Sequence, residues 1–287
     1  MNGKEVNITN DKRAYKQITG DLENLYKNEI YTCESKCIHY SDCFKKAKEK
    51  GYNDGWDSDY AAKVGKNYPL QINNKEIRIV IVGKEGLCNH KELMPPARLK
   101  GAYNHHYRET YKVLCEMLNY NWDSNGNRNK EEGEYQERPD AVLTAFALTN
   151  TYRCAFKKKY EKKTKKGVKK AEAIYRTEEQ RCCIEILRKE LDILKPTILF
   201  IQNAGLTAEN LYQGEIFHIH KKEENGIYDF SKHKDKGFYI IQTVHPTCYG
   251  RWYYFVKKCL SNIVDYLQKE SVLPTNDISA ALDELAN

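Results

Sequence analysis

Three residues whose side chains suit catalysis or recognition lie at or just beyond the ends of long apolar stretches: Glu85, Asn150 and His245. A carboxylate such as that of Glu85 can hold a water molecule and offset positive charge. The carboxamide of Asn150 offers one acceptor oxygen and two donor hydrogens to a polar heterocycle. A fixed imidazole such as that of His245 can donate a hydrogen bond to an oxygen that gains negative charge.

The elements that must position these residues are four apolar segments. They cover residues 77–83, 141–150, 197–201 and 237–244. Their continuous apolar and β-branched composition is typical of strands buried on both faces, as in a parallel sheet. Because ligands bind beyond the carboxyl ends of such strands, we expect Glu85, Asn150 and His245 to lie on one rim and to build one site.

Helical periodicity separates these strands and predicts an α/β fold with right-handed crossovers. Helices are expected over 11–31, from about 103 to 118, from a capping box at 177–180 to Pro196, and after His245. Loops or connectors are expected at 51–75, 84–104 and 121–140, with a charged insertion at 219–236. We expect one domain over 1–270, on which a helix and a cysteine cluster (11–50) pack, and a tail or short helix over 271–287.

The composition fits a cytoplasmic protein with a polyanionic partner. The chain has 287 residues, with 47 Lys and Arg against 40 Asp and Glu, a formal net charge of +7. Apolar runs are too short to cross a bilayer, and the first residues lack a secretory signal, so no membrane association is expected. The ten cysteines are then expected to be buried thiols or metal ligands rather than a disulfide framework.

Three motifs give the chain a family resemblance. They are LTNTYRC at 148–154, a cysteine thirteen residues before a proline that opens a strand (Cys183 to Pro196), and HPTCYGR at 245–251. Their order along the strands resembles the uracil-DNA glycosylase superfamily, especially its iron–sulfur branch, over about residues 20–267. The resemblance implies a three-layer αβα sandwich around a central four-stranded parallel sheet, and a monomer that acts on DNA.

The implied activity is that of a monofunctional DNA glycosylase, which flips a pyrimidine out of DNA and hydrolyses its glycosidic bond. Asn150 then reads the O4 and N3 edge of uracil, and His245 donates to O2 of the departing base. Glu85 places the water, and Tyr103 stacks on the flipped base. Structural roles remain open for each: a strand-end turn for Asn150, a structural strand-end histidine for His245, an exposed loop acid for Glu85 and core packing for Tyr103.

DNA contacts are implied at two further places. The loop after His245 carries Arg251 and Trp252 and is expected at the minor groove, where a side chain fills the space of the flipped base. The basic run 157–170, with Lys163 and Lys166, is expected to contact phosphates. The simpler interpretations are a surface position for Arg251, core packing for Trp252 and a solvated charge run for 157–170.

The resemblance also implies a structural [4Fe–4S] cluster held by Cys33, Cys37, Cys154 and Cys183. Zinc would accept the same four thiolates, and reduced core cysteines are the third reading. Cys43 can replace Cys33 or Cys37, and Cys182 can replace Cys183 if the helix register shifts.

The first motif of the family departs here from its usual form. It reads Gly83-Lys84-Glu85-Gly86, with no proline and a displaced acid. This change points to a specialised site, so hypermodified cytosine in phage DNA, as a target of antiviral defence, stands beside uracil repair. A non-catalytic DNA-binding protein and a metal-dependent hydrolase, with metal at Glu85, His90 and His245, are the other classes.

Overall fold

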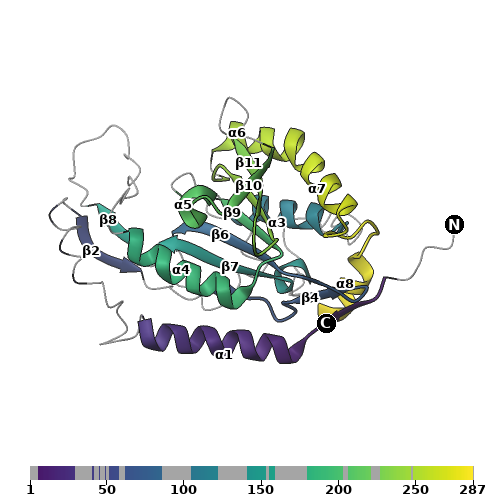
Figure 1. The fold of residues 1–287 in the computed structure, drawn as a ribbon, viewed down its shortest axis with the longest axis horizontal. Coiled ribbons are helices and arrows are strands. Elements are labelled where there is room, and N and C mark those ends of the chain that lie inside the picture. The colour runs from purple at the N-terminus through teal and green to yellow at the C-terminus, as the bar shows by residue number, and fades with distance from the viewer. Residues whose placement is uncertain are drawn as a thin grey trace, which may run out of the picture.

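The computed structural model describes residues 6–29, 41, 45, 49, 52–57, 62–85, 105–121, 141–152, 155–158, 180–202, 206–220, 227–246 and 248–286. In this part of the chain, helices cover both faces of a central sheet (Figure 1). No helix among these residues is both long and apolar enough to cross a membrane.

The central sheet has seven strands in the order β10-β11-β12-β9-β6-β7-β3. Their bounds are β3 Lys63–Val64, β6 Ile79–Glu85, β7 Phe146–Tyr152, β9 Ile198–Gln202, β10 Ile216–His220, β11 Tyr228–His233 and β12 Tyr239–Thr243. The pairs β12–β9, β9–β6 and β6–β7 are parallel, and β10–β11, β11–β12 and β3–β7 are antiparallel. The α/β class is therefore confirmed, but the sheet is mixed and larger than the four strands expected.

Two segments that we predicted to be irregular contain strands. The charged insertion 219–236 overlaps the β10–β11 hairpin, in which charged residues such as Lys232 lie close to buried ones such as Phe230. The connector 51–75 contains β2 (Tyr52–Asp57), β3 and β4 (Leu70–Ile72), and it runs into β5 (Lys75–Ile77). β1 (Ile8–Asn10), β4 and β5 form a separate three-stranded sheet. Antiparallel strands with one solvated face lack the continuous apolar run by which the central strands were recognised.

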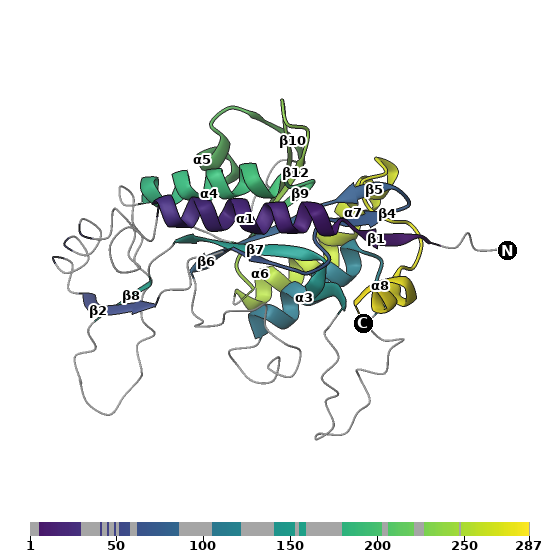
Figure 2. The ribbon, with the colours of Figure 1, turned by 90° about the horizontal axis from the view of Figure 1, so that it is seen from below.

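The helices form a layer on each face of the sheet (Figure 2). One layer contains α1 (Lys12–Glu29), α4 (Gln180–Leu194) and α5 (Ala208–Tyr212). The other contains α3 (His105–Met117), α6 (Tyr249–Tyr254), a π-helical turn (Phe255–Cys259) and α7 (Leu260–Lys269). A 3-10 turn at Ala141–Thr144 precedes β7, and α8 (Ser279–Ala286) follows α7. The main helices thus form where the apolar periodicity predicts them.

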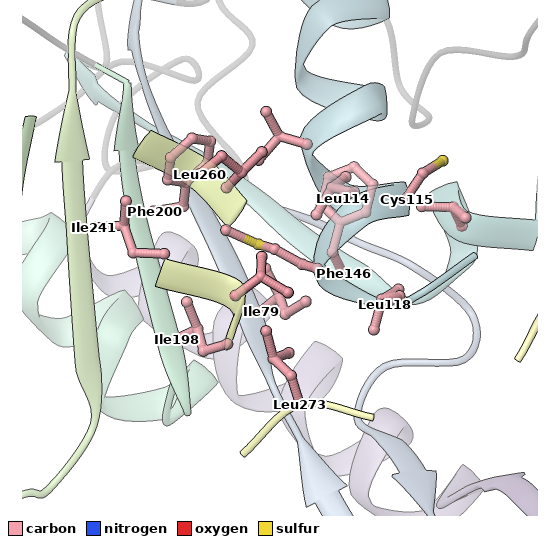
Figure 3. Close-up of a cluster of buried hydrophobic side chains, with 14 of the residues drawn as sticks. Ile79, Leu114, Cys115, Leu118, Phe146, Ile198, Phe200, Ile241, Leu260 and Leu273 are labelled. Atoms are coloured by element: carbon pink, nitrogen blue, oxygen red, sulfur yellow. The ribbon is translucent and has the colours of Figure 1, made fainter. Parts of the chain in front are cut away.

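Alternate residues of each strand enter different hydrophobic clusters. Ile79, Ile81 and Phe200 pack with α3 and α7, as Figure 3 shows for part of this cluster. Val80 and Val82 pack with α1 and α4 on the opposite face. We refer to these as the α3 face and the α4 face of the sheet.

A buried carboxylate joins α1, α4 and β7. Glu190 of α4 is fully buried, and its two oxygens accept hydrogen bonds from the hydroxyls of Tyr26 and Thr149, both at 2.6 Å. The Tyr26 hydroxyl in turn accepts a hydrogen bond from the backbone N–H of Ala62 at 2.7 Å. Because a buried charge is costly unless hydrogen-bonded, these contacts hold both helices against the strand that carries Asn150.

Replacing Tyr26 with Phe removes one donor from this carboxylate and leaves the ring in place. We expect the free energy of unfolding to fall by about 1.5–3 kcal/mol, the range for a hydrogen bond to a charged group. Urea denaturation of the purified protein measures the change. The control is Tyr253→Phe, because Tyr253 is 64% exposed and should change stability by less than about 0.5 kcal/mol. Equal stability of wild type and Tyr26→Phe would contradict the role given to the carboxylate.

Candidate functional site

One row of residues crosses the four parallel strands near their carboxyl ends. Asn150 of β7 pairs with Gly83 of β6, and Thr243 of β12 pairs with Gln202 of β9. The last β6–β9 pair is Val82 with Ile201, so continuing this register by one residue places Gln202 beside Gly83. Side chains alternate along each strand, and these four positions share the α3 face with Phe200.

Gly83 makes room for the side chain of Asn150. A Cβ atom at position 83 would lie 2.7 Å from Oδ1 of Asn150, closer than real contacts of this kind. The Asn150 carboxamide therefore leans over the glycine, toward the strand that carries Gln202. Asn150 itself is half-buried, so its amide combines a fixed position with partial access.

Gln202 is the second carboxamide of this row. It is fully buried, and its Oε1 accepts a hydrogen bond from the hydroxyl of Thr110 in α3 at 3.0 Å. Its Nε2 is buried and has no hydrogen-bond partner among the described residues. The indole Nε1 of Trp252 is in the same state, and the Trp252 ring lies 6.3 Å from that of Phe200 on the same face. Two buried donors without partners therefore belong to one layer.

The row lies where the direction of the chain across the sheet reverses. From β6 the chain continues to β7 on one side, and from β9 it continues to β12 on the other. In open α/β sheets this switch point, at the carboxyl ends of the strands, is where ligands bind. Gly83 and Gln202 belong to the two strands that flank it, and Asn150 lies one strand further out.

His245 lies on the other flank of the switch point, just beyond β12. It is half-buried, and its backbone carbonyl accepts a hydrogen bond from the N–H of Cys248 at 2.8 Å. This turn leads into α6. β12 and β7 are three strand spacings of about 4.8 Å apart, so the backbones of Thr243 and Asn150 are about 14 Å apart, and His245 lies two residues beyond Thr243. The structure thus brings both residues to the same rim, on opposite flanks of Gly83 and Gln202.

The two residues predicted to contact DNA after His245 differ in exposure. Arg251 is exposed on α6. Trp252 is 2% exposed, and its ring lies 5.6 Å from that of Phe255 and packs in the core. A side chain buried in this way acts as a packing residue, so the proposed DNA contacts keep Arg251 and omit Trp252.

Several predicted site residues lie outside the described part of the chain. These are Tyr103, Lys163, Lys166, Cys33, Cys37 and Cys154. Glu85 is the last residue of β6, in register with Tyr152 of β7, and only its backbone is described. Its position at the end of β6 agrees with the rim predicted for it.

The described elements pair segments that neighbour the predicted metal ligands in the sequence. Cys183 is a buried free thiol in the first half of α4. α1, which precedes Cys33 and Cys37 in the sequence, packs on α4, and Glu29 of α1 contacts Lys189 of α4. After these cysteines, β2 pairs with β8 (Ala155–Lys158), which begins directly after Cys154. Figures 1 and 2 show β2 and β8 near the end of the molecule at which α1 ends.

Sequence reasoning missed Gln202, Thr110 and Glu190. A signal for Gln202 was present, because it is a polar residue that ends the apolar run 197–201, just as Asn150 ends its own strand. Thr110 and Glu190 lie in amphipathic helices, where a polar residue is ordinary, and only the packing shows that both are buried.

Comparison with known proteins adds no relative: no family model matches the sequence, and no curated protein matches it significantly. The chemistry of this site therefore has to be argued from the residues of this chain.

Replacing Gly83 with Ala should displace Asn150 and leave the fold intact. The added Cβ meets the end of a flexible side chain, so we expect the free energy of unfolding to change by less than about 1 kcal/mol. The side-chain amide resonances of Asn150 should shift strongly in NMR spectra. Gly20→Ala is the control, because nothing lies within 4 Å of a Cβ there. Unchanged Asn150 resonances in Gly83→Ala would show that the carboxamide does not lean over Gly83 in solution.

Proposed function

We propose that this protein is a DNA glycosylase of the uracil-DNA-glycosylase type, which releases a pyrimidine and leaves an abasic site. The observation that carries the proposal is the row at the switch point, with the Asn150 carboxamide on one flank and His245 on the other. These residue types at these strand ends are what the resemblance implies. The parallel strands β7, β6, β9 and β12 support the corresponding finer fold, a four-stranded parallel core within the larger mixed sheet.

The proposed reaction needs little from the protein beyond positioning and electrostatics. Water attacks C1′ of the flipped nucleotide and loses a proton to solvent, while the bond from C1′ to N1 of the base breaks. The bonding electrons leave with the base, which then takes up a proton. Asn150 orients the base through its polar edge, and His245 donates a hydrogen bond to O2, where the negative charge collects. A carboxylate at position 85 holds the water and offsets positive charge on the sugar.

The surface beyond His245 suits a DNA backbone. Arg251 is exposed on α6, Tyr253 is 64% exposed, and Lys257 and Lys258 are exposed on the following turn. Cations contact phosphates, and an exposed aromatic ring can stack on a base. Lys163 and Lys166 would extend the same contacts. This cationic surface adjoins the rim, which supports DNA as the partner rather than a free nucleoside.

Mutation of the two flanking residues tests the activity. We expect Asn150→Ala and His245→Ala each to slow base release by at least about a hundredfold, because each removes a preorganised group that stabilises the transition state. Mass spectrometry of bases released from DNA that contains uracil, cytosine or modified cytosines measures the rates. Asn262→Ala and His220→Ala are matched controls, since both residues are exposed and away from the row.

The same assay separates the competing functions. Release from phage DNA with hypermodified cytosine, and not from uracil DNA, would assign the protein to antiviral defence rather than repair. Binding to uracil or abasic DNA with no base released by wild type would replace the glycosylase with a non-catalytic DNA-binding protein.

We further propose that Cys33, Cys37, Cys154 and Cys183 hold a [4Fe–4S] cluster with a structural role. Four thiolates are the donor set that such a cluster requires. The packing of α1 on α4 and the pairing of β2 with β8 support the proposal, because they tie together the three segments that carry these cysteines. The cluster would brace these segments beside the rim.

Replacing Cys183 with Ser should abolish stoichiometric binding of iron and sulfide and the brown colour of the purified protein. Metal and sulfide analysis of anaerobically purified protein measures this. Cys248→Ser and Cys259→Ser are the controls, one residue exposed and the other buried, and both variants should keep the cluster. Full iron content in Cys183→Ser would remove this residue from the ligand set, and stoichiometric zinc in wild type would replace the cluster with a zinc site.

A further inference from the structure

We infer that Gln202 is a specificity-determining residue, which selects a pyrimidine that presents a hydrogen-bond acceptor to its Nε2. The inference deepens the proposed function, because it depends on the row at the switch point being the base-binding site. Nothing in the sequence motifs points to this residue. It follows from the burial, the register and the hydrogen bonding of the carboxamide.

In the structure, the Gln202 amide turns its Oε1 toward Thr110, whose hydroxyl donates to it at 3.0 Å. In this orientation Nε2, which can only donate, is the end of the amide that is left for a ligand. This atom is buried, and no described residue accepts a hydrogen bond from it. A buried donor without an acceptor costs about 1–3 kcal/mol, so native proteins rarely keep one without a reason. A ligand with an acceptor atom at this place would recover that cost.

The location of Gln202 indicates what kind of ligand meets it. Its strand flanks the switch point, and it lies beside Gly83, whose lack of a side chain lets the Asn150 carboxamide approach. The Asn150 side chain leans over that glycine from the opposite side. A flat heterocycle that contacts Asn150 would therefore come within reach of Gln202.

A group such as Nε2 of Gln202, which can only donate a hydrogen bond, discriminates between the two common pyrimidines. Uracil carries a carbonyl at C4 and an N–H at position 3, and cytosine carries an amino group at C4 and a bare nitrogen at position 3. A donor that faces either position accepts one base and opposes the other. A site built to hydrogen-bond its substrate rejects the mismatched analogue much more strongly than an apolar site does.

The test compares wild type with Gln202→Leu, Gln202→Met and Thr110→Val. The substrates are DNA duplexes that differ only in uracil, cytosine or 5-hydroxymethylcytosine at one position. We expect the ratio of kcat/KM between the preferred and the disfavoured pyrimidine to fall at least tenfold in both Gln202 variants. Thr110→Val should lower this kcat/KM ratio less, because the Gln202 amide loses its partner and can rotate. Gln242→Met is the matched control, since the Gln242 carboxamide lies on the opposite, α4 face of the sheet, where its Oε1 accepts a hydrogen bond from the backbone N–H of Ala208.

Calorimetric titration of the free bases uracil and cytosine into the same variants gives a second readout that needs neither DNA nor catalysis. If wild type releases a base and the Gln202 variants keep its preference, the inference fails and the glycosylase stands. Suppose that wild type releases no base from any DNA but binds one free base in preference to the other, and that the Gln202 variants lose this preference. The proposed glycosylase activity is then wrong, and the inference about Gln202 stands. If no base is released and neither free base binds preferentially, both fail. Thermal unfolding checks that each variant is folded, and Gln202→Met serves where Gln202→Leu does not fold.

Discussion

The shared parallel register of β7, β6, β9 and β12 is the constraint on which the candidate site depends. Side chains alternate between the two faces of a strand, so a slip of one residue sends every side chain to the other face. In the observed register, Asn150, Gly83, Gln202 and Thr243 share the α3 face. A slip of β7 alone would turn Asn150 toward α4. The apolar residues earlier in the same strands hold the register, because each face must bury its own hydrophobic cluster.

The hydrogen bonds of the Glu190 carboxylate connect β7 with α1 and α4. Thr149, which precedes Asn150, points to the α4 face and donates to Glu190, while Tyr26 donates to the same carboxylate from α1. The polar interaction on one face of β7 thus positions the carboxamide on the other. α1 is followed in the sequence by the N-terminal cysteines, and α4 carries Cys183. An interaction that stabilises these segments therefore also stabilises β7, the strand that carries Asn150.

The sequence predicts the fold and the site to different degrees, for physical reasons. Strands buried on both faces form continuous apolar runs, which is why the four parallel strands and the helices between them were predictable. The β10–β11 hairpin mixes charged and apolar residues, so it was predicted to be an insertion. For Trp252 the sequence left core packing and a DNA contact both open, because an aromatic residue near a helix start looks alike on either face. The place of Gln202 in the row depends on long-range pairing, which local patterns do not specify.

The buried polar groups around Glu190 and around Gln202 differ in how completely their hydrogen bonds are satisfied. Around Glu190 each carboxylate oxygen accepts a hydrogen bond and each hydroxyl has a partner, so the network stabilises the fold without a ligand. On the α3 face the Gln202 and Trp252 donors have no acceptor among the described residues, although both side chains are buried. Had Gln202 been needed only for packing, Leu would fill a similar volume without an unsatisfied polar atom. Because the buried hydroxyl of Ser231 in β11 also lacks a partner among the described residues, the missing acceptor alone does not indicate a ligand, and it is the place of Gln202 at the switch point of the sheet that does.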